Sequence, residues 1–253
     1  MTRWVFERAS QLCGSLSDVF LYAAAAVTPL NEVREGVRQY WADWDGEGKF
    51  GTTPFPWEQD LLARFVSDGQ GERVLIVGCG SCRDAIPLLQ RGCTVTGVDP
   101  AEEALERGRR RLAELGYAPR LDCAFFEDWE HDAVFDVCWF SWFVYSHMPD
   151  SRRRIQALRK AARCLAPGGR VVLCYMNQRV VSRAAALGRR IGNMWGRPEW
   201  RLEDGDVLTR LPGKRVPRYD HRFTLDEIQA EANAAGLHLA YVLTPIVVLK
   251  PDD

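Results

Sequence analysis

The sequence predicts an α/β fold with a mostly parallel sheet and helices on both of its faces. Two observations lead to this prediction: short apolar runs of strand length alternate with helical patterns, and the first run ends in a glycine turn. Strands that alternate with helices of this length form parallel sheets with right-handed crossovers. With 253 residues and 47% hydrophobic content, the chain can bury a complete core.

The alternating elements begin after residue 70. The strand-like runs are Arg73–Val77, Thr94–Val98, Arg120–Phe125, Phe135–Ser141 and Arg170–Tyr175. The helical patterns between them are Asp84–Arg91, Ala101–Leu115 and Ser151–Leu165. The segment Ala166-Pro-Gly-Gly should end the last of these helices and turn the chain into the next strand.

The C-terminal part of the chain predicts one more helix and two more strands. Thr224 and Glu227 have the spacing of a capping box, and Gly236 is placed to end the helix that starts there. Leu237–Thr244 and Ile246–Leu249 then read as two strands with a tight connection.

The most informative motif is Val74-Leu-Ile-Val-Gly-Cys-Gly, followed by Val95-Thr-Gly-Val-Asp-Pro. Gly78 and Gly80 let the backbone come close to a ligand. Asp99 ends the next strand, where a carboxylate can accept hydrogen bonds from both hydroxyls of a ribose. A dinucleotide fingerprint would need glycine where this chain has Arg83, and the chain contains no P-loop motif. The motif therefore predicts a ligand with a ribose but no pyrophosphate.

These residues resemble the class I S-adenosylmethionine-dependent methyltransferases of the small-molecule type. Cys82 replaces the third glycine of the family pattern, and Arg163-Cys-Leu-Ala-Pro-Gly-Gly is similar to the family's lead into strand 5. The resemblance covers roughly residues 70–178 well and 221–250 more loosely. It implies a Rossmann-like, seven-stranded sheet with one antiparallel strand near its end. It also implies S-adenosylmethionine as the cofactor and S-adenosylhomocysteine as its product.

The resemblance further implies a cofactor site made of residues that follow the strands. Its expected members are Gly78, Cys79, Gly80, Asp99, Pro100, Asp128, Trp129 and Ser141. Asp99 would hold the ribose hydroxyls, Asp128 would accept from the adenine amino group and Trp129 would stack on the adenine ring. A solvated turn is the alternative for Glu127 and Asp128.

The acceptor site is expected along Trp139-Phe-Ser-Trp-Phe-Val-Tyr-Ser-His. The candidate catalytic residues are Tyr145, His147 and His221. In-line methyl transfer depends mainly on positioning and exclusion of water, and a base is needed only where the acceptor carries a proton at neutral pH. For His147 the alternative is a role in shaping the pocket, and for His221 it is hydrogen bonding at the start of the last helix.

Two segments outside the sheet are expected to select the acceptor. We divide the chain into an N-terminal helical lid, residues 1–70, and a methyltransferase domain, residues 71–253, with a cationic insert at 178–222. The insert holds 11 Lys or Arg against 5 Asp or Glu, which favours a small anionic acceptor. The expected acceptor-binding residues are Tyr40, Trp44, Trp142, Arg215, Arg218 and Arg222. Core packing is the alternative for the N-terminal tryptophans.

Composition limits the remaining function classes. An RNA (tRNA) methyltransferase and a non-catalytic S-adenosylmethionine-binding partner protein stay open as alternatives, although no RNA-binding module is visible and a nucleic-acid partner is not expected.

Cys79 and Cys82 lack a second ligand pair, so we expect no metal. Val19–Val27 is too short to span a membrane, and we expect a cytoplasmic protein. The triplet Arg152–Arg154 is expected on a solvated helix face. The sequence leaves the acceptor atom and the oligomeric state open.

Overall fold

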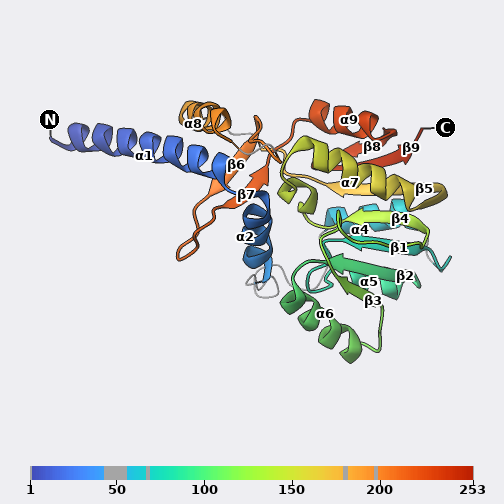
Figure 1. Cartoon of the computed structure of the whole chain (residues 1–253). Helices are drawn as coiled ribbons and strands as arrows, with labels where there is room; N and C mark the ends of the chain where they lie inside the picture. The colour runs from blue at the N-terminus through green and yellow to red at the C-terminus, as the bar shows by residue number, and fades with distance from the viewer. Residues whose placement is uncertain (1, 43–55, 67–68, 179–181, 197–198, 253) are drawn as a thin grey trace.

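A seven-stranded sheet runs through the centre of the protein, for which the computed structural model describes residues 2–42, 56–66, 69–178, 182–196 and 199–252 (Figure 1). The strands follow the order β3-β2-β1-β4-β5-β9-β8, and β9 runs antiparallel to both of its neighbours. Their bounds are β1 Arg73–Val77, β2 Thr94–Asp99, β3 Arg120–Cys123, β4 Phe135–Phe140, β5 Leu165–Cys174, β8 Leu237–Leu243 and β9 Ile246–Pro251. The predicted Rossmann-like, mostly parallel sheet is confirmed.

Helices cover both faces of the sheet, as predicted, because the central strands are apolar on both sides. Along β1, Leu75 and Val77 join one hydrophobic layer, while Val74 and Ile76 join the other. The first layer includes residues of α7 (Ser151–Arg163) and α9 (Leu225–Ala234). The second includes residues of α4 (Pro56–Phe65), α5 (Ala85–Gln90) and α6 (Glu102–Glu114).

The start of α9 confirms the capping box. The Thr224 hydroxyl accepts from the Glu227 backbone N–H at 3.2 Å, and the Thr224 N–H donates to the Glu227 carboxylate at 2.8 Å. These two bonds satisfy backbone donors that the first turn of a helix leaves without partners.

The glycine turn expected before β5 lies inside the strand instead. β5 pairs with β4 at Leu165 and again from Arg170, and the register shifts between these two points. Gly168 adopts a φ of +78°, which glycine reaches without a steric penalty. Ala166-Pro-Gly-Gly is therefore an irregularity that bends the strand rather than a turn that precedes it.

Two N-terminal helices stand beside the sheet rather than on it. α1 (Thr2–Val27) projects away from the body, and α2 (Leu30–Ala42) turns back toward the left-hand strand ends in Figure 1. The segment after β5 forms α8 (Arg183–Met194) and an antiparallel pair, β6 (Asp206–Thr209) and β7 (Arg218–His221). α8 packs against α1, and β7 packs against α2 and the short 3-10 helix η1 (Val144–His147).

The α1–α8 contact depends on glycine. A Cβ added to Gly188 would lie 2.4 Å from the Val19 carbonyl oxygen, and one added to Gly192 would lie 2.6 Å from the Ala26 Cβ. The two helices therefore approach each other more closely than any side chain at these positions would allow.

No single helix in the described part of the chain is both long and apolar enough to cross a membrane. The segments Leu12–Val27 and Leu30–Ala42 meet the criteria of length and composition only when taken together, and they are bent by 114° at their junction.

Candidate functional site

A deep cleft lies where the strands β1, β2 and β4 end. It encloses about 1260 Å³ of empty space, its open mouth included. The turns that follow the three strands line its floor, and α2 lines its opposite wall with Arg34, Val37, Arg38 and Trp41. A cleft at the carboxyl ends of parallel strands is the usual ligand site of an α/β sheet.

The turn after β1 brings bare backbone to the cleft. Gly78 and Gly80 have φ values of +74° and +48°. A Cβ on Gly78 would lie 2.7 Å from Val144, whereas a Cβ on Gly80 would meet nothing within 4 Å. Gly78 is therefore required by packing, and the backbone of Gly80 borders open space. Cys82, which stands in place of a third glycine, also has a positive φ of 64° and is fully buried.

Asp99 ends β2 with its carboxylate facing the cleft. Its Oδ2 accepts from the Gly80 N–H at 2.9 Å, and its Oδ1 accepts from the Ala101 N–H at 2.8 Å. Burial raises the pKa of Asp99, and these two backbone bonds partly oppose the shift. Each oxygen has a second lone pair, so the carboxylate can accept from two further hydroxyls. Pro100 and Cys79 also line the cleft.

The turn after β3 presents different residues from those expected. Phe125, Phe126 and Glu127 line the cleft, whereas Asp128 and Trp129 do not. The indole of Trp129 donates to Asp122 at 2.9 Å and is buried away from the cleft. The Asp128 side chain is 62% exposed and bonds to Arg34 at 2.6 Å. The adenine contacts assigned to Asp128 and Trp129 are therefore corrected: the first acid of the turn, Glu127, faces the cleft.

Asp84 is a cleft residue to which sequence reasoning assigned no role. The Ser141 hydroxyl, at the end of β4, donates to the Asp84 carboxylate at 2.6 Å, and both residues line the cleft. Burial and the neighbouring Glu58 raise the pKa of Asp84, while Ser141 and Arg83 lower it. Asp84 follows the glycine turn directly in the sequence, so its place near the end of β1 could have been predicted. Its contact with Ser141 depends on the pairing of β1 with β4.

His147 faces the cleft from the end of η1 with one free ring nitrogen. Its Nδ1 lies 3.0 Å from the Tyr219 carbonyl oxygen, which can only accept, so Nδ1 carries the proton. Nε2 is buried and has no hydrogen-bond partner among the described residues. Burial lowers the pKa of His147, and the Trp41 ring lies edge-on at 5.2 Å. The residue is therefore a neutral imidazole whose Nε2 lone pair has no partner among the described residues.

Tyr145 and His221, the other two catalytic candidates, lie outside the cleft. The Tyr145 hydroxyl donates to Glu231 at 2.5 Å, and the residue is fully buried beneath Phe223. His221 is held by Asp206, 2.6 Å from its Nδ1. Both side chains are buried away from the cleft by these bonds, to Glu231 of α9 and to Asp206 of β6. Their catalytic assignment is corrected.

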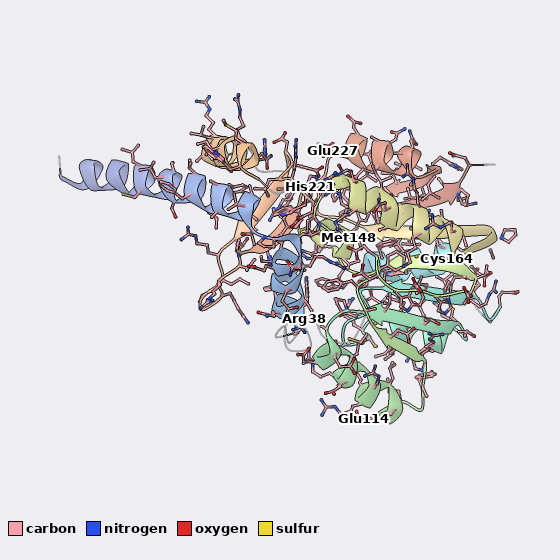
Figure 2. All side chains as sticks on the ribbon, viewed as in Figure 1. Arg38, Glu114, Met148, Cys164, His221 and Glu227 are labelled. Carbon is pink, nitrogen blue, oxygen red and sulfur yellow. The ribbon has the colours of Figure 1, made fainter. Side chains whose placement is uncertain are left out.

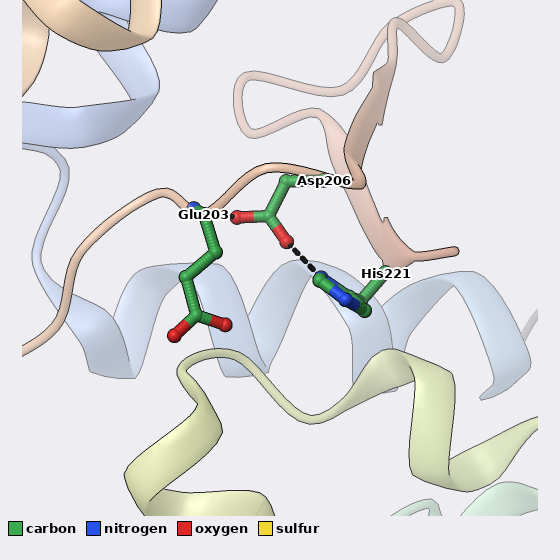
Figure 3. Close-up of side chains that lie close together, drawn as sticks. All are labelled: Glu203, Asp206 and His221. Carbon is green, nitrogen blue, oxygen red and sulfur yellow. Dashed lines mark hydrogen bonds and ion pairs between the residues drawn. The ribbon is translucent and has the colours of Figure 1, made fainter. Parts of the chain in front are cut away.

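Figure 3 shows that His221 shares a cluster with Glu203 and Asp206, whose ligand atoms lie within 4.8 Å of one another. Asp206 accepts from the Tyr219 hydroxyl at 2.7 Å and from the Glu203 N–H at 2.6 Å, besides its bond to His221. Glu203 accepts from the backbone N–H of Ser151 and from a buried arginine. These donors already use the oxygens that a cation would need, so we assign the cluster to holding β6 and β7 together.

The expected acceptor-binding residues are three aromatic side chains and three arginines of the insert. Trp142 lines the cleft, and Trp41 lines it in place of its neighbour Tyr40. Trp44 lies outside the described residues.

The three insert arginines expected to bind the acceptor do not line the cleft. Arg218 lies over the Tyr40 ring at 4.7 Å, Arg222 donates to the Gln178 carbonyl and Arg215 is exposed. The positive charges of the cleft come from elsewhere, namely Arg34, Arg38, Arg83, Arg107 and Arg111. The assignment of acceptor contacts to Arg215, Arg218 and Arg222 is therefore corrected.

Comparison with known proteins adds to this geometry. A family model described as a methyltransferase domain matches residues 74–169. The chain is 31% identical over 197 residues to a ubiquinone biosynthesis O-methyltransferase of Caulobacter sp. (strain K31), covering 68% of this chain and 75% of that relative. It is 32% identical over 145 residues to a protein of the same name from Idiomarina loihiensis, covering 55% of this chain and 57% of the relative. The chain thus spans little more than half the length of the second relative.

Solved structures share the fold at lower identity. The Burkholderia thailandensis 1,6-didemethyltoxoflavin-N1-methyltransferase has a TM-score of 0.64 and 16% identity, with 90% of this chain and 92% of that chain covered. Its structure contains S-adenosylhomocysteine and 1,6-didemethyltoxoflavin. At this identity the likeness shows the fold alone.

Proposed function

Because the chain belongs to the class I S-adenosylmethionine-dependent methyltransferases, we propose that it methylates a hydroxyl group on a small aromatic acceptor. The observation behind this proposal is the free Nε2 of His147, buried at the wall of the cofactor cleft. An acceptor hydroxyl carries a proton at neutral pH and needs a base at this point. The ubiquinone O-methyltransferases to which the chain is similar also act on oxygen, as their name states.

The residues of the cleft fit S-adenosylmethionine. The bare backbone at Gly80 borders open space, and the buried Asp99 carboxylate keeps a free lone pair on each oxygen. Asp99 would hold the ribose hydroxyls, Phe125 and Glu127 would contact the adenine, and the turn from Gly78 to Gly80 would hold the methionyl part. When bound, the cofactor supplies an electrophilic methyl group on a positively charged sulfur.

Aromatic and apolar side chains surround His147 on the cleft side. Trp41, Trp142, Val144 and Met148 line the cleft with it. Such walls favour a flat, apolar ring that stacks on indole and excludes water. Trp142 and its neighbour Phe143 have positive φ values of 29° and 36°, so this turn is held in a backbone conformation that non-glycine residues rarely adopt.

The acceptor proton has a defined route. The hydroxyl donates to Nε2 of His147, and the proton passes to Nε2 as the oxygen forms its new bond to carbon. The Tyr219 carbonyl stabilises the resulting imidazolium through Nδ1–H, 3.0 Å away. The proton then leaves to solvent with the departing product.

The acceptor in this proposal is neutral rather than anionic. The anionic acceptor expected from the sequence depended on insert arginines that do not line the cleft. Within the cleft, Arg34, Arg38 and Arg83 already bond to carboxylates of Asp128, Glu35 and Glu58. These pairs leave less positive charge for an acceptor than the arginine count implies.

A matched pair of acceptors tests the proposal. Catechol and its carboxylated analogue protocatechuate differ by one ring carboxylate, which carries a negative charge. We expect S-adenosylhomocysteine release with catechol, a ring O-methyl product by mass spectrometry, and no gain in kcat/KM from the carboxylate. N- or S-methylation from a metabolite extract, with no O-methyl product, would overturn the proposal. A large preference for protocatechuate would restore the anionic acceptor.

A further inference from the structure

Large apolar side chains are exposed on one part of the molecule far more than elsewhere. We define the helical arm as α1 together with α8 and its C-terminal neighbour Trp195. Of the twelve large hydrophobic side chains that are exposed in the described chain, seven belong to this arm: Leu12, Leu16, Phe20, Val27, Leu187, Met194 and Trp195. Met194 and Trp195 are 75% and 70% exposed. α1 projects away from the sheet (Figure 1), and the described part of the body leaves these side chains exposed.

The outward face of α8 combines these apolar residues with unpaired positive charge. Arg183, Leu187, Arg190 and Met194 are spaced by four, three and four residues, which places them on one side of the helix, and all four are exposed. The opposite side carries Gly188 and Gly192, which pack on α1. Arg183 and Arg190 have no ion-pair partner among the described residues, and α8 contains no acidic residue.

We infer that the helical arm docks on the surface of an anionic lipid bilayer. A helix with leucine, methionine and a terminal tryptophan beside arginines matches the interfacial region, where apolar side chains enter the acyl boundary and guanidinium groups meet lipid phosphates. The long arginine side chains can lie along the surface while their charges stay at the headgroups. Arg183 and Arg190 belong to the cationic insert, and neither of them lines the cleft.

Two other partners fit the face less well. A nucleic acid would neutralise the arginines but would gain nothing from Leu187, Met194 and the exposed α1 stripe. A second copy of the chain, joined through a two-fold contact on α8, would bring Arg183 and Arg190 of both copies into one interface. With no acid on either helix, that contact would repel. An anionic bilayer satisfies the charge and the apolar side chains together.

Vesicle flotation of the purified full-length chain tests the inference. The probes are vesicles of phosphatidylcholine alone and vesicles of phosphatidylcholine and phosphatidylglycerol in equal parts. We expect flotation with the anionic vesicles, little with the neutral ones, and loss of flotation at high salt because the headgroup attraction is screened. Absence of flotation with anionic vesicles at low salt would overturn the inference.

Two variants identify the surface. Arg183→Gln with Arg190→Gln should weaken partitioning by about tenfold or more, given about 1 kcal/mol per basic residue. Met194→Gln with Trp195→Ser should weaken it at low salt, where the wild type floats, because the apolar contact is lost while both arginines remain. The matched control, Arg110→Gln with Arg163→Gln, removes two exposed arginines from α6 and α7 and should float like the wild type. All of these side chains are exposed, so melting temperatures should not change.

The same variants separate a bilayer from a second copy. Light scattering should give the same mass for wild type and for the Met194→Gln, Trp195→Ser variant. A dimer that becomes a monomer in this variant would show that the arm binds another copy. Equal flotation of the arm and control variants would show that the vesicles bind elsewhere, and either result overturns the inference.

Discussion

The buried Asp99 carboxylate holds two turns of the fold together and is also the group proposed to bind the cofactor ribose. Its bonds to Gly80 and Ala101 tie the turn after β1 to the turn after β2. The same bonds help to keep the carboxylate ionised against the burial that raises its pKa. The site is therefore arranged before the cofactor arrives, which lowers the cost of ordering on binding.

Replacing Asp99 should weaken cofactor binding strongly. Asp99→Asn keeps the size but loses the charge and one acceptor, so we expect a loss of about 2–3 kcal/mol in the binding free energy of S-adenosylmethionine by calorimetry. Asp136→Asn removes a carboxylate that pairs with Arg73 and does not line the cleft, and should bind as the wild type does. Unchanged affinity in Asp99→Asn would contradict the ribose assignment.

The pH profile of the reaction should report His147. Burial lowers its pKa from the ordinary 6.5, although the Tyr219 carbonyl and the Asp220 carboxylate partly oppose the shift. The neutral imidazole is the base, so kcat/KM should rise as the pH passes upward through the lowered pKa and should be level above about pH 6.5.

His147→Gln should remove this limb and reduce kcat by roughly 10²–10⁴-fold, with little change in cofactor affinity. His238→Gln, a half-exposed histidine on β8, is the control and should keep the wild-type profile. An unchanged rate in His147→Gln would leave the residue with a role in pocket shape only.

Among the elements, α2 and α1 have different tasks despite their continuity in sequence. α2 lines the cleft and reaches across it: Arg34 bonds to Asp128 after β3, and Arg38, labelled in Figure 2, bonds to Glu103 on α6. No described side chain of α1 lines the cleft, and α1 packs on α8 instead. Within the N-terminal segment that the sequence predicted to be a lid, α2 is the described element that lines the cleft.

The α1–α8 contact should be sensitive to a single methyl group. Gly188→Ala would place a Cβ 2.4 Å from the Val19 carbonyl, so the helices must separate, at a cost of about 1–3 kcal/mol. Hydrogen exchange of α1 should then accelerate, while cofactor affinity stays near wild type.

Gly14→Ala is the matched control, because nothing lies within 4 Å of its added Cβ. It should stabilise α1 by about 0.5–1 kcal/mol through helix propensity alone. If Gly188→Ala slowed the hydrogen exchange of α1 as much as Gly14→Ala does, the inference that α1 and α8 are closely packed at Gly188 would be wrong.

At the scale of the whole molecule, one buried ionic network joins distant segments. Arg154 of α7 bonds to Glu231 of α9 at 2.7 Å and to Glu203 of the insert at 2.8 Å. Tyr145 bonds to the same Glu231. This network explains why Tyr145 points away from the cleft, and it links the insert to the helical layer that covers the sheet.

The sequence predicted the features that depend on neighbouring residues and missed those that depend on distant ones. Gly78, Gly80 and Asp99 follow from strand–turn patterns of a few residues. The turn after β3 could not be predicted so closely, because Lys160 of α7 donates to the Phe126 and Glu127 carbonyls and fixes which side chains face the cleft. The place of α8 depends on a glycine contact with a helix more than 150 residues earlier.

Arg154 shows that the burial of a charged residue is equally hard to predict from neighbouring residues. It was expected on a solvated helix face with Arg152, yet it is 1% exposed and lies 5.0 Å from the Phe223 ring. A run of three arginines on a helix necessarily points in three directions, and only the partners on α9 and the insert decide which of them is buried.

Removing Arg154 should therefore destabilise the whole fold. Arg154→Met leaves Glu231 buried without its cation, and we expect a loss of about 3–5 kcal/mol and a fall of roughly 10 °C in melting temperature. Arg163→Met changes an exposed arginine at the end of the same helix and should stay within about 0.5 kcal/mol of the wild type.

Adding Glu231→Gln to Arg154→Met removes the orphaned charge and should recover part of the loss, because an unpaired buried carboxylate costs more than a neutral amide. If the double variant were less stable than Arg154→Met by the full cost of Glu231→Gln alone, the two residues would not be coupled. The network would then be a set of separate contacts rather than the joint between the insert and the helical layer.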